Sequence, residues 1–297
     1  MPVHTDAVMG TFVSVDVGGD GAGAAAGRAL AWFRDIESAC TRFDPRSELM
    51  RLTARAGTPV AASPALFEAV RFAVALAEET GGAFDPTVGH RMANRGFDRE
   101  HRSGDAAPRA DGVDDDVSFR DVLVDEAERT ITLRRPLVLD LGAVAKGLAI
   151  DAAARELRAF GDFAIDAGGD LYVGGRNRRG EPWAVGIRHP ADAGELLQTV
   201  RVSDRAVCTS GGYERPASAS AGGPGEHHII DPRSGRSPAD VASVTVVAPS
   251  AMLADALATA AFVLGPVDGL ALLGRLDVEG LIVTHDLARH STPGFPR

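Results

Sequence analysis

The chain has 297 residues, a formal net charge of −10 and an apolar content of 45%, which suits one large globular core or two smaller ones. The negative charge argues against nucleic acid as the main partner, because phosphate binding needs a basic surface. No run of about 18 apolar residues predicts a membrane span.

Two features of the sequence bear on its compartment. The first residues lack both the basic region and the apolar region of an export signal. Cys40 and Cys208 fit no metal-binding spacing and are interpreted as reduced, buried thiols. The sequence therefore predicts a cytoplasmic protein.

Helices dominate the first half of the chain. The alternating segment Thr11–Val17 predicts a strand, and an Ala-rich helix follows over about Ala24–Cys40. Ser63–Pro64 is typical of the N-cap and first position of a helix, which we expect to run to Gly81. Val122–Val124 and Thr130–Leu133 flank an acidic turn and predict a hairpin.

Strands dominate the second half, after a predicted helix from Val144 to about Phe160. The predicted strands are Phe163–Asp166, Leu171–Val173, Trp183–Ile187, Ala206–Thr209, His228–Asp231, Ser243–Val247 and Leu281–Thr284. Regular alternation of strands and helices is missing. We therefore predict an α+β fold, with mixed or antiparallel sheets and packed helices, and a boundary between two lobes near Pro136.

A carboxylate and a hydroxyl stand four residues apart in the segment after Ser250. Ala and Leu dominate this segment, which predicts a helix with Ser250 as its N-cap and Gly265–Pro266 as its end. Asp255 and Thr259 then share one face, about a turn apart. Two hard oxygen ligands on a rigid element suit Mg²⁺, although an ordinary solvated helix face has the same spacing.

Two further segments carry candidate chemistry. His227 and His228 precede the turn Asp231–Gly235, and on a strand their side chains would point to opposite faces, so only one of them is expected to face a site. Asp140–Gly147 leads a buried strand into a helix start, where backbone N–H groups and Lys146 could meet phosphate. A structural turn and a surface lysine are the alternatives.

Taken in order, the segments of this chain resemble the ApbE-type family of FAD:protein FMN transferases. The resemblance extends from residue 9 to about residue 285. The matching segments are Met9–Thr11, Arg42–Leu49, Gly82–Gly89, Asp140–Asp151, Asp166–Asp170, Thr209–Arg215, His228–Gly235 and Ser243–Gly265.

The resemblance implies a single family domain over residues 1–297, with the flavin site between its two lobes. It also implies Mg²⁺-dependent transfer of FMN from FAD to a threonine hydroxyl of an acceptor flavoprotein, with release of AMP. Asp255 and Thr259 would bind Mg²⁺ through their side chains and Ala143 through its backbone carbonyl, while His228 would assist attack by the acceptor hydroxyl. FAD contacts would fall at Met9, Phe43, Ala83, Phe84, Asp85, Lys146 and Ile229.

Two other functions remain open at this stage. One is an Mg²⁺-dependent FAD pyrophosphatase, which would give FMN and AMP without a protein acceptor. The other is a non-catalytic carrier that binds FAD without turnover. The Asp255/Thr259 pair and His228 favour catalysis over storage, because a carrier needs neither a phosphate-binding cation nor a base.

Overall fold

The computed structural model describes residues 3–100, 104, 106–108, 112–213 and 226–296. The chain forms two compact units, each built from separate stretches of sequence. We call residues 1–34, 146–214 and 239–297 unit 1, and residues 35–145 and 215–238 unit 2. The helices α1 (Ala22–Cys40) and α5 (Gly142–Leu157) each contribute residues to both units.

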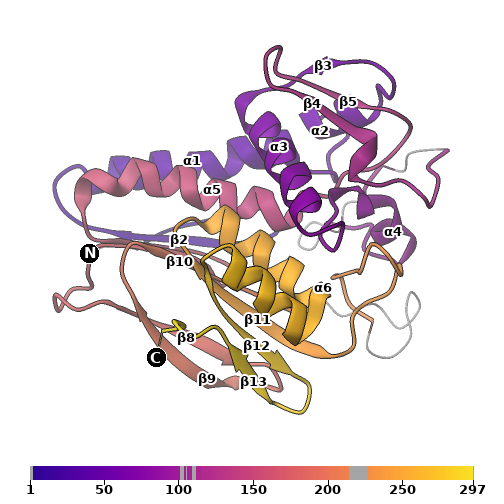
Figure 1. The fold of residues 1–297 in the computed structure, drawn as a ribbon. Coiled ribbons are helices and arrows are strands. Elements are labelled where there is room, and N and C mark those ends of the chain that lie inside the picture. Colours follow the sequence, from indigo (N-terminus) through magenta and orange to yellow (C-terminus); the bar gives the residue numbers. More distant parts are fainter. Residues whose placement is uncertain (1–2, 101–103, 105, 109–111, 214–225, 297) are drawn as a thin grey trace. The chain divides into compact units, whose positions relative to one another are not determined.

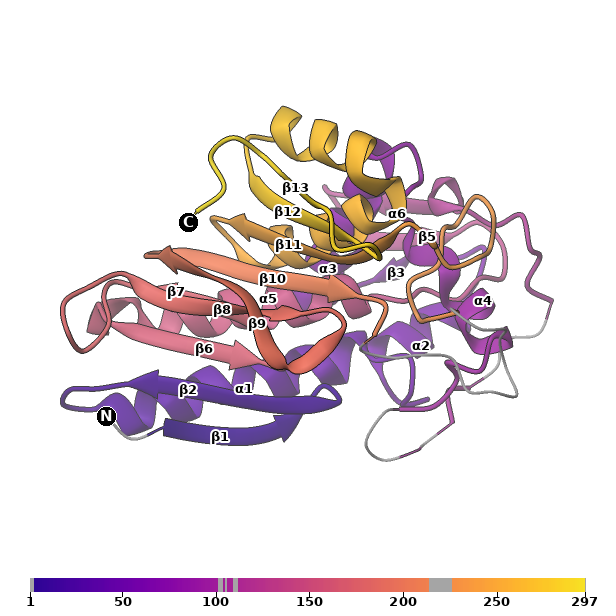
Figure 2. The ribbon, with the colours of Figure 1, turned by 90° about the horizontal axis from the view of Figure 1, so that it is seen from below.

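Unit 1 is built on an eight-stranded sheet with the order β1-β2-β6-β7-β10-β11-β12-β13, shown in Figure 2. Every neighbouring pair in it is antiparallel. Its strands are β1 (Val3–Val8), β2 (Thr11–Val17), β6 (Phe163–Ala167), β7 (Asp170–Gly174), β10 (Arg205–Gly211), β11 (Val241–Ala248), β12 (Glu279–Thr284) and β13 (Arg289–Ser291).

The two faces of this sheet are covered differently. The helix α6 (Ala251–Arg275) packs on β7, β10, β11 and β12 (Figure 1). A two-stranded hairpin, β8 (Trp183–His189) and β9 (Asp192–Val202), brings its apolar side chains against the same strands, including Val207 and Val247. Because alternate residues of a strand point to opposite faces, Val207 faces the hairpin while its neighbour Cys208 faces α6.

The start of α6 is held against α5 by close contact and by a buried carboxylate. A Cβ at Gly147 would lie 2.5 Å from Cα of Met252, so only glycine permits this approach of the two helices. Asp151 accepts hydrogen bonds from the backbone N–H groups of Ala251 (2.7 Å) and Met252 (3.0 Å). These groups have no partner within the helix, so Asp151 satisfies donors that α6 itself leaves open.

Replacing Asp151 with alanine is expected to lower the free energy of unfolding by about 1–3 kcal/mol, because two partly buried N–H groups lose their acceptor. Asp125 is the matched control, since it also accepts from two backbone N–H groups, those of Ala127 and Glu128, but is exposed. Urea denaturation of both variants measures the difference. Equal losses for Asp151→Ala and Asp125→Ala would contradict the capping role.

Unit 2 contains a small antiparallel sheet, helices and short 3₁₀ turns. The sheet has the order β3-β5-β4. Its elements are β3 (Val60–Ala61), β4 (Val122–Asp125), β5 (Thr130–Leu133), α2 (Glu48–Thr53), α3 (Pro64–Glu79), α4 (Gly89–Asn94), η1 (Pro86–Val88) and η2 (Phe119–Asp121). A further 3₁₀ turn, η3 (Arg158–Phe160), follows α5 in unit 1.

Several predicted elements differ from the observed ones. The segment His228–Asp231 is not a strand, and only the isolated bridge between Asp231 and Arg236 pairs there. The helix after Ser250 is interrupted at Gly265–Pro266, as predicted, because Gly265 is non-helical (φ +79°). A second helical segment, which was not predicted, follows directly and extends α6 to Arg275. Strands β1, β3, β9 and β13 and helices α2 and α4 are additional to the prediction, and the predicted strand that leads into α5 at Asp140 is not formed.

Among the described residues, α6 is the one helix whose length and composition would allow a membrane span, with a mean hydropathy of 1.8. The hydropathy is the mean over an 18-residue stretch of α6, and 56% of that stretch is buried inside the protein. The side chains of α6 that face β10, β11 and β12 therefore serve the core of unit 1.

Candidate functional site

A partly buried ion pair joins α5 to the central sheet of unit 1. Lys146 contacts the carboxylate of Asp170, which is 2% exposed and begins β7. The other carboxylate oxygen of Asp170 accepts a hydrogen bond from the Thr209 backbone N–H at 3.1 Å. Asp170 thus fixes the position of the Lys146 ammonium relative to β10, while Lys146 keeps further N–H groups for an anion.

A second group of candidate site residues lies on α6, in the same unit as the Lys146–Asp170 pair. Ser250 caps the helix by accepting from the Leu253 N–H, as predicted. Asp255 is only 6% exposed, so it does not stand on a solvated helix face. One turn later, the hydroxyl of Thr259 lies 3.1 Å from the hydroxyl of Ser210 on β10.

Cys208 lies among these charged residues. Its thiol is fully buried and lies 3.7 Å from the Ala251 carbonyl. Burial raises the pKa of Cys208 well above its usual value, the Asp255 carboxylate raises it further, and Lys146 opposes the shift. Cys40 is buried as well, and its pKa is raised to about 12 by burial and by the charge of Glu48. Both cysteines are free and buried, as predicted.

The donors around α6 fit a hard divalent cation. Among the described residues, no group of three or more His, Cys, Asp or Glu side chains gathers into a metal site. A buried carboxylate and a hydroxyl one turn apart nevertheless suit Mg²⁺, which is often held by one or two carboxylates together with substrate phosphates.

Met9 occupies a strained turn at one end of the sheet of unit 1. Met9 (φ 54°) and Gly10 (φ 71°) form the two-residue turn between β1 and β2, and a non-glycine residue rarely adopts this left-handed conformation. The turn between β6 and β7 lies nearby, because the Gly168 N–H donates to the Phe12 carbonyl at 3.2 Å. Strain of this kind is typical of functional turns.

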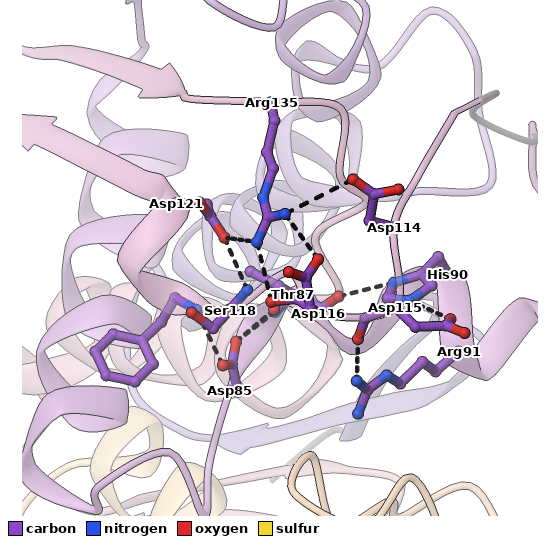
Figure 3. A network of polar contacts seen from close by, with 11 residues as sticks. Asp85, Thr87, His90, Arg91, Asp114, Asp115, Asp116, Ser118, Asp121 and Arg135 are labelled. Atoms are coloured by element: carbon purple, nitrogen blue, oxygen red, sulfur yellow. Dashed lines mark hydrogen bonds and ion pairs between the residues drawn. The ribbon is translucent and has the colours of Figure 1, made fainter.

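In unit 2, Asp85 holds the turn that follows α3. Figure 3 shows its carboxylate beside Thr87 and Ser118. One oxygen accepts from the Thr87 backbone N–H (2.9 Å) and hydroxyl (2.7 Å), and the other accepts from the Phe119 N–H (3.0 Å). Burial raises the pKa of Asp85, and these hydrogen bonds oppose the rise.

A cavity of about 220 Å³ opens beside Asp85, within unit 2. Two of the arginines that line it, Arg91 and Arg233, have polar partners. Arg91 donates to the carbonyls of Pro232 and Asp115, and Arg233 pairs with Asp231 at 2.9 Å. Hydrogen bonds and an ion pair therefore hold part of the cavity lining in place.

Arg42 connects three segments of unit 2. It is 4% exposed, pairs with Asp140 at 2.6 Å, and donates to the Phe97 carbonyl at 2.5 Å. Its guanidinium also lies 4.4 Å from the ring centre of Phe43. Arg42 thereby positions Phe43 and Asp140, which lies just before α5. Ala143 follows in the first turn of that helix.

The two histidines differ in their surroundings. His227 is buried and both ring nitrogens have partners, since Nδ1 accepts from the Ile229 N–H at 3.3 Å and Nε2 lies 3.2 Å from the Pro238 carbonyl. His228 is half-buried, and its ring and that of Phe97 form a T-shaped contact with their centres 6.4 Å apart. His227 therefore has a structural role. Ile229, which follows His228, is buried.

The predicted site residues fall in both units. Unit 1 holds Met9, Lys146, Asp255 and Thr259, and unit 2 holds Phe43, Ala83, Phe84, Asp85, Ala143, His228 and Ile229. The flavin contacts, the cation ligands and the place of the flavin between two lobes remain predictions. Sequence reasoning assigned no role to Arg42, Asp170 or Ser210, although all three lie in segments that carry the family resemblance.

The comparisons with known proteins decide the family. The ApbE family model matches residues 9–282. The chain belongs to the ApbE family. The FAD:protein FMN transferase of Treponema pallidum is 36% identical over 274 residues, covering 84% of this chain and 74% of the relative. The FAD:protein FMN transferase of Vibrio cholerae is 32% identical over 260 residues, covering 84% of this chain and 76% of the relative.

Solved structures of the ApbE family share the fold. The ApbE protein of Thermotoga maritima has a TM-score of 0.88 and 27% identity, with 100% of this chain and 99% of that chain covered. The flavin transferase ApbE of Vibrio cholerae has a TM-score of 0.82 and 26% identity, with 99% and 97% covered. The predictions of the family, the α+β fold and an enzyme of the FAD:protein FMN transferase class are confirmed.

Proposed function

We propose that this ApbE family member transfers FMN from FAD to a threonine hydroxyl of an acceptor flavoprotein, in a reaction that needs Mg²⁺ and releases AMP. The observation that carries the proposal is the buried Asp255 one turn from Thr259 on α6, in the same unit as the Lys146–Asp170 pair. The names of the relatives support the flavin donor and the protein acceptor.

The cation would be held by the Asp255 carboxylate, the Thr259 hydroxyl and the Ala143 carbonyl. When bound, Mg²⁺ would neutralise the pyrophosphate of FAD and keep it aligned for attack. Lys146 lies on α5 one turn after Ala143, and Asp170 orients its ammonium. We propose that Lys146 stabilises the negative charge that develops on the phosphate as AMP departs.

His228 is the proposed base. A bond forms between the threonine oxygen and the phosphorus of the FMN moiety, and the bond from that phosphorus to the bridging oxygen breaks. AMP leaves with the bridging oxygen, and the threonine proton passes to a His228 ring nitrogen. Met9, Phe43, Ala83, Phe84, Asp85 and Ile229 are proposed to contact FAD.

The test follows AMP and covalent flavin in parallel. Purified protein is incubated with FAD and Mg²⁺, with and without a candidate acceptor, and AMP release is measured chromatographically. Flavin fluorescence on the acceptor in a denaturing gel, located by mass spectrometry on threonine, supports the proposal. EDTA is expected to remove both signals.

The same experiment separates the two other functions. AMP release at the same rate with and without acceptor, and no covalent flavin, would favour an FAD pyrophosphatase. Bound FAD with no AMP at all would favour a carrier. The carrier is not preferred, because the buried carboxylate, the hydroxyl and the half-buried histidine are more than storage requires. The pyrophosphatase is not preferred, because the relatives are named FAD:protein FMN transferases.

We also propose a cytoplasmic location. The two free, buried thiols, Cys40 and Cys208, support this location, because they suit a reducing compartment. Fractionation of cells that express the native gene tests this, with covalent flavin followed on cytoplasmic and exported acceptors. Modification confined to exported acceptors would contradict it.

A further inference from the structure

Two hydroxyl pairs occur at successive residues of β10, on opposite faces of the sheet. Ser210 faces α6, and its Oγ lies 3.1 Å from the Thr259 hydroxyl. Thr209 points the other way, and its hydroxyl lies 2.9 Å from that of Thr245 on β11. Ser210 is 9% exposed. One pair therefore adjoins the proposed cation site, and the other provides a chemically similar comparison.

A hydroxyl that binds a cation has a fixed proton direction. It carries one proton and two lone pairs, and a lone pair must point at the cation. The proton of Thr259 must then be donated away from the cation. The Ser210 oxygen lies at hydrogen-bond distance on the neighbouring strand and can accept it.

We propose that Ser210 is a positioning residue of the cation site, which accepts the Thr259 proton and so directs a Thr259 lone pair toward the divalent cation. This inference rests on the proposed function, since it needs the cation at Asp255 and Thr259. Hydrogen-bond partners of metal ligands orient those ligands, and their loss weakens metal affinity by about 10–100-fold.

The experiment measures Mn²⁺ affinity of the full chain in the absence of FAD, by isothermal titration and by the EPR signal of free Mn²⁺. Ser210→Ala is expected to weaken Mn²⁺ binding by about tenfold or more. Ser210→Thr keeps a hydroxyl and suits a strand, so we expect it to restore most of the affinity. Thermal melting of both variants reports the fold independently.

Thr245→Val is the matched control, because it breaks the hydroxyl pair on the opposite face of the same strand. It should leave Mn²⁺ affinity near that of the wild type. Equal Mn²⁺ affinity of Ser210→Ala and wild type, or an equal loss in Thr245→Val, would overturn the role of Ser210.

Asp255→Ala separates this inference from the proposed function. If Asp255→Ala loses Mn²⁺ while Ser210→Ala binds normally, the cation site stands and the positioning role is wrong. If wild type and Asp255→Ala bind Mn²⁺ equally, the proposed cation site fails and the role of Ser210 fails with it.

Discussion

Replacing Asp255 with alanine is expected to abolish Mg²⁺-dependent AMP release, with a loss of at least about 100-fold. The side chain is 6% exposed, and its carboxylate is the one charged group among the three proposed ligands of the cation. The fold should survive, because alanine is the best helix former and the position lies in an Ala-rich helix. Removal of a buried carboxylate also removes its desolvation penalty.

Asp268→Ala is the matched control for this experiment. Asp268 lies on the same helix beyond the bend at Gly265 and is exposed. We expect its Mg²⁺ titration, AMP release and melting temperature to match those of the wild type. An Asp255→Ala protein that releases AMP with an unchanged Mg²⁺ dependence would show that the cation is held elsewhere.

The elements that the sequence predicts well are those with local signals. The Ser63–Pro64 pair begins α3 as expected, with the Ser63 hydroxyl accepting from the Leu66 N–H. The acidic turn after Val124 joins β4 and β5 as a hairpin. In both cases neighbouring residues supply the stabilising contacts, so no distant partner needs to be known.

The elements that the sequence misses depend on distant partners. β9 contains Glu195, Leu196 and Leu197, good helix formers, yet it pairs along β8 and places Leu197 in the core. His228–Asp231 has the composition of a strand, but the preceding His227 is held by hydrogen bonds from its backbone N–H to the Ser237 hydroxyl and from its ring to the Pro238 carbonyl. Tertiary contacts decided both cases, against the local preference.

The same distinction applies to the candidate site. The Asp255/Thr259 spacing is visible in the sequence, because residues four apart share a helix face. The Lys146–Asp170 pair joins residues 24 apart, and the Ser210–Thr259 contact joins residues 49 apart. Only the packing of α5 and α6 on the sheet brings these groups together. The one local signal for Asp170 is its place directly after the Gly168–Gly169 pair.

Replacing His228 with alanine is expected to slow FMN transfer by about 10²–10⁴-fold while FAD affinity changes little. A base that accepts the threonine proton lowers the barrier without anchoring FAD in the ground state. His228 is half-buried beside Phe97, so its ring is partly accessible and its loss leaves no large cavity. Single-turnover transfer to the acceptor measures the rate, and quenching of flavin fluorescence measures the affinity.

His227→Ala provides the comparison, because His227 uses both ring nitrogens to hold its own segment. We expect it to lower the melting temperature, through the unpaired Ile229 N–H and Pro238 carbonyl, and to slow transfer less than His228→Ala does. The ratio of transfer rate to FAD affinity distinguishes the two roles. Equal losses of transfer rate in both variants, or a loss of FAD affinity alone in His228→Ala, would contradict the assignment of His228 as the base.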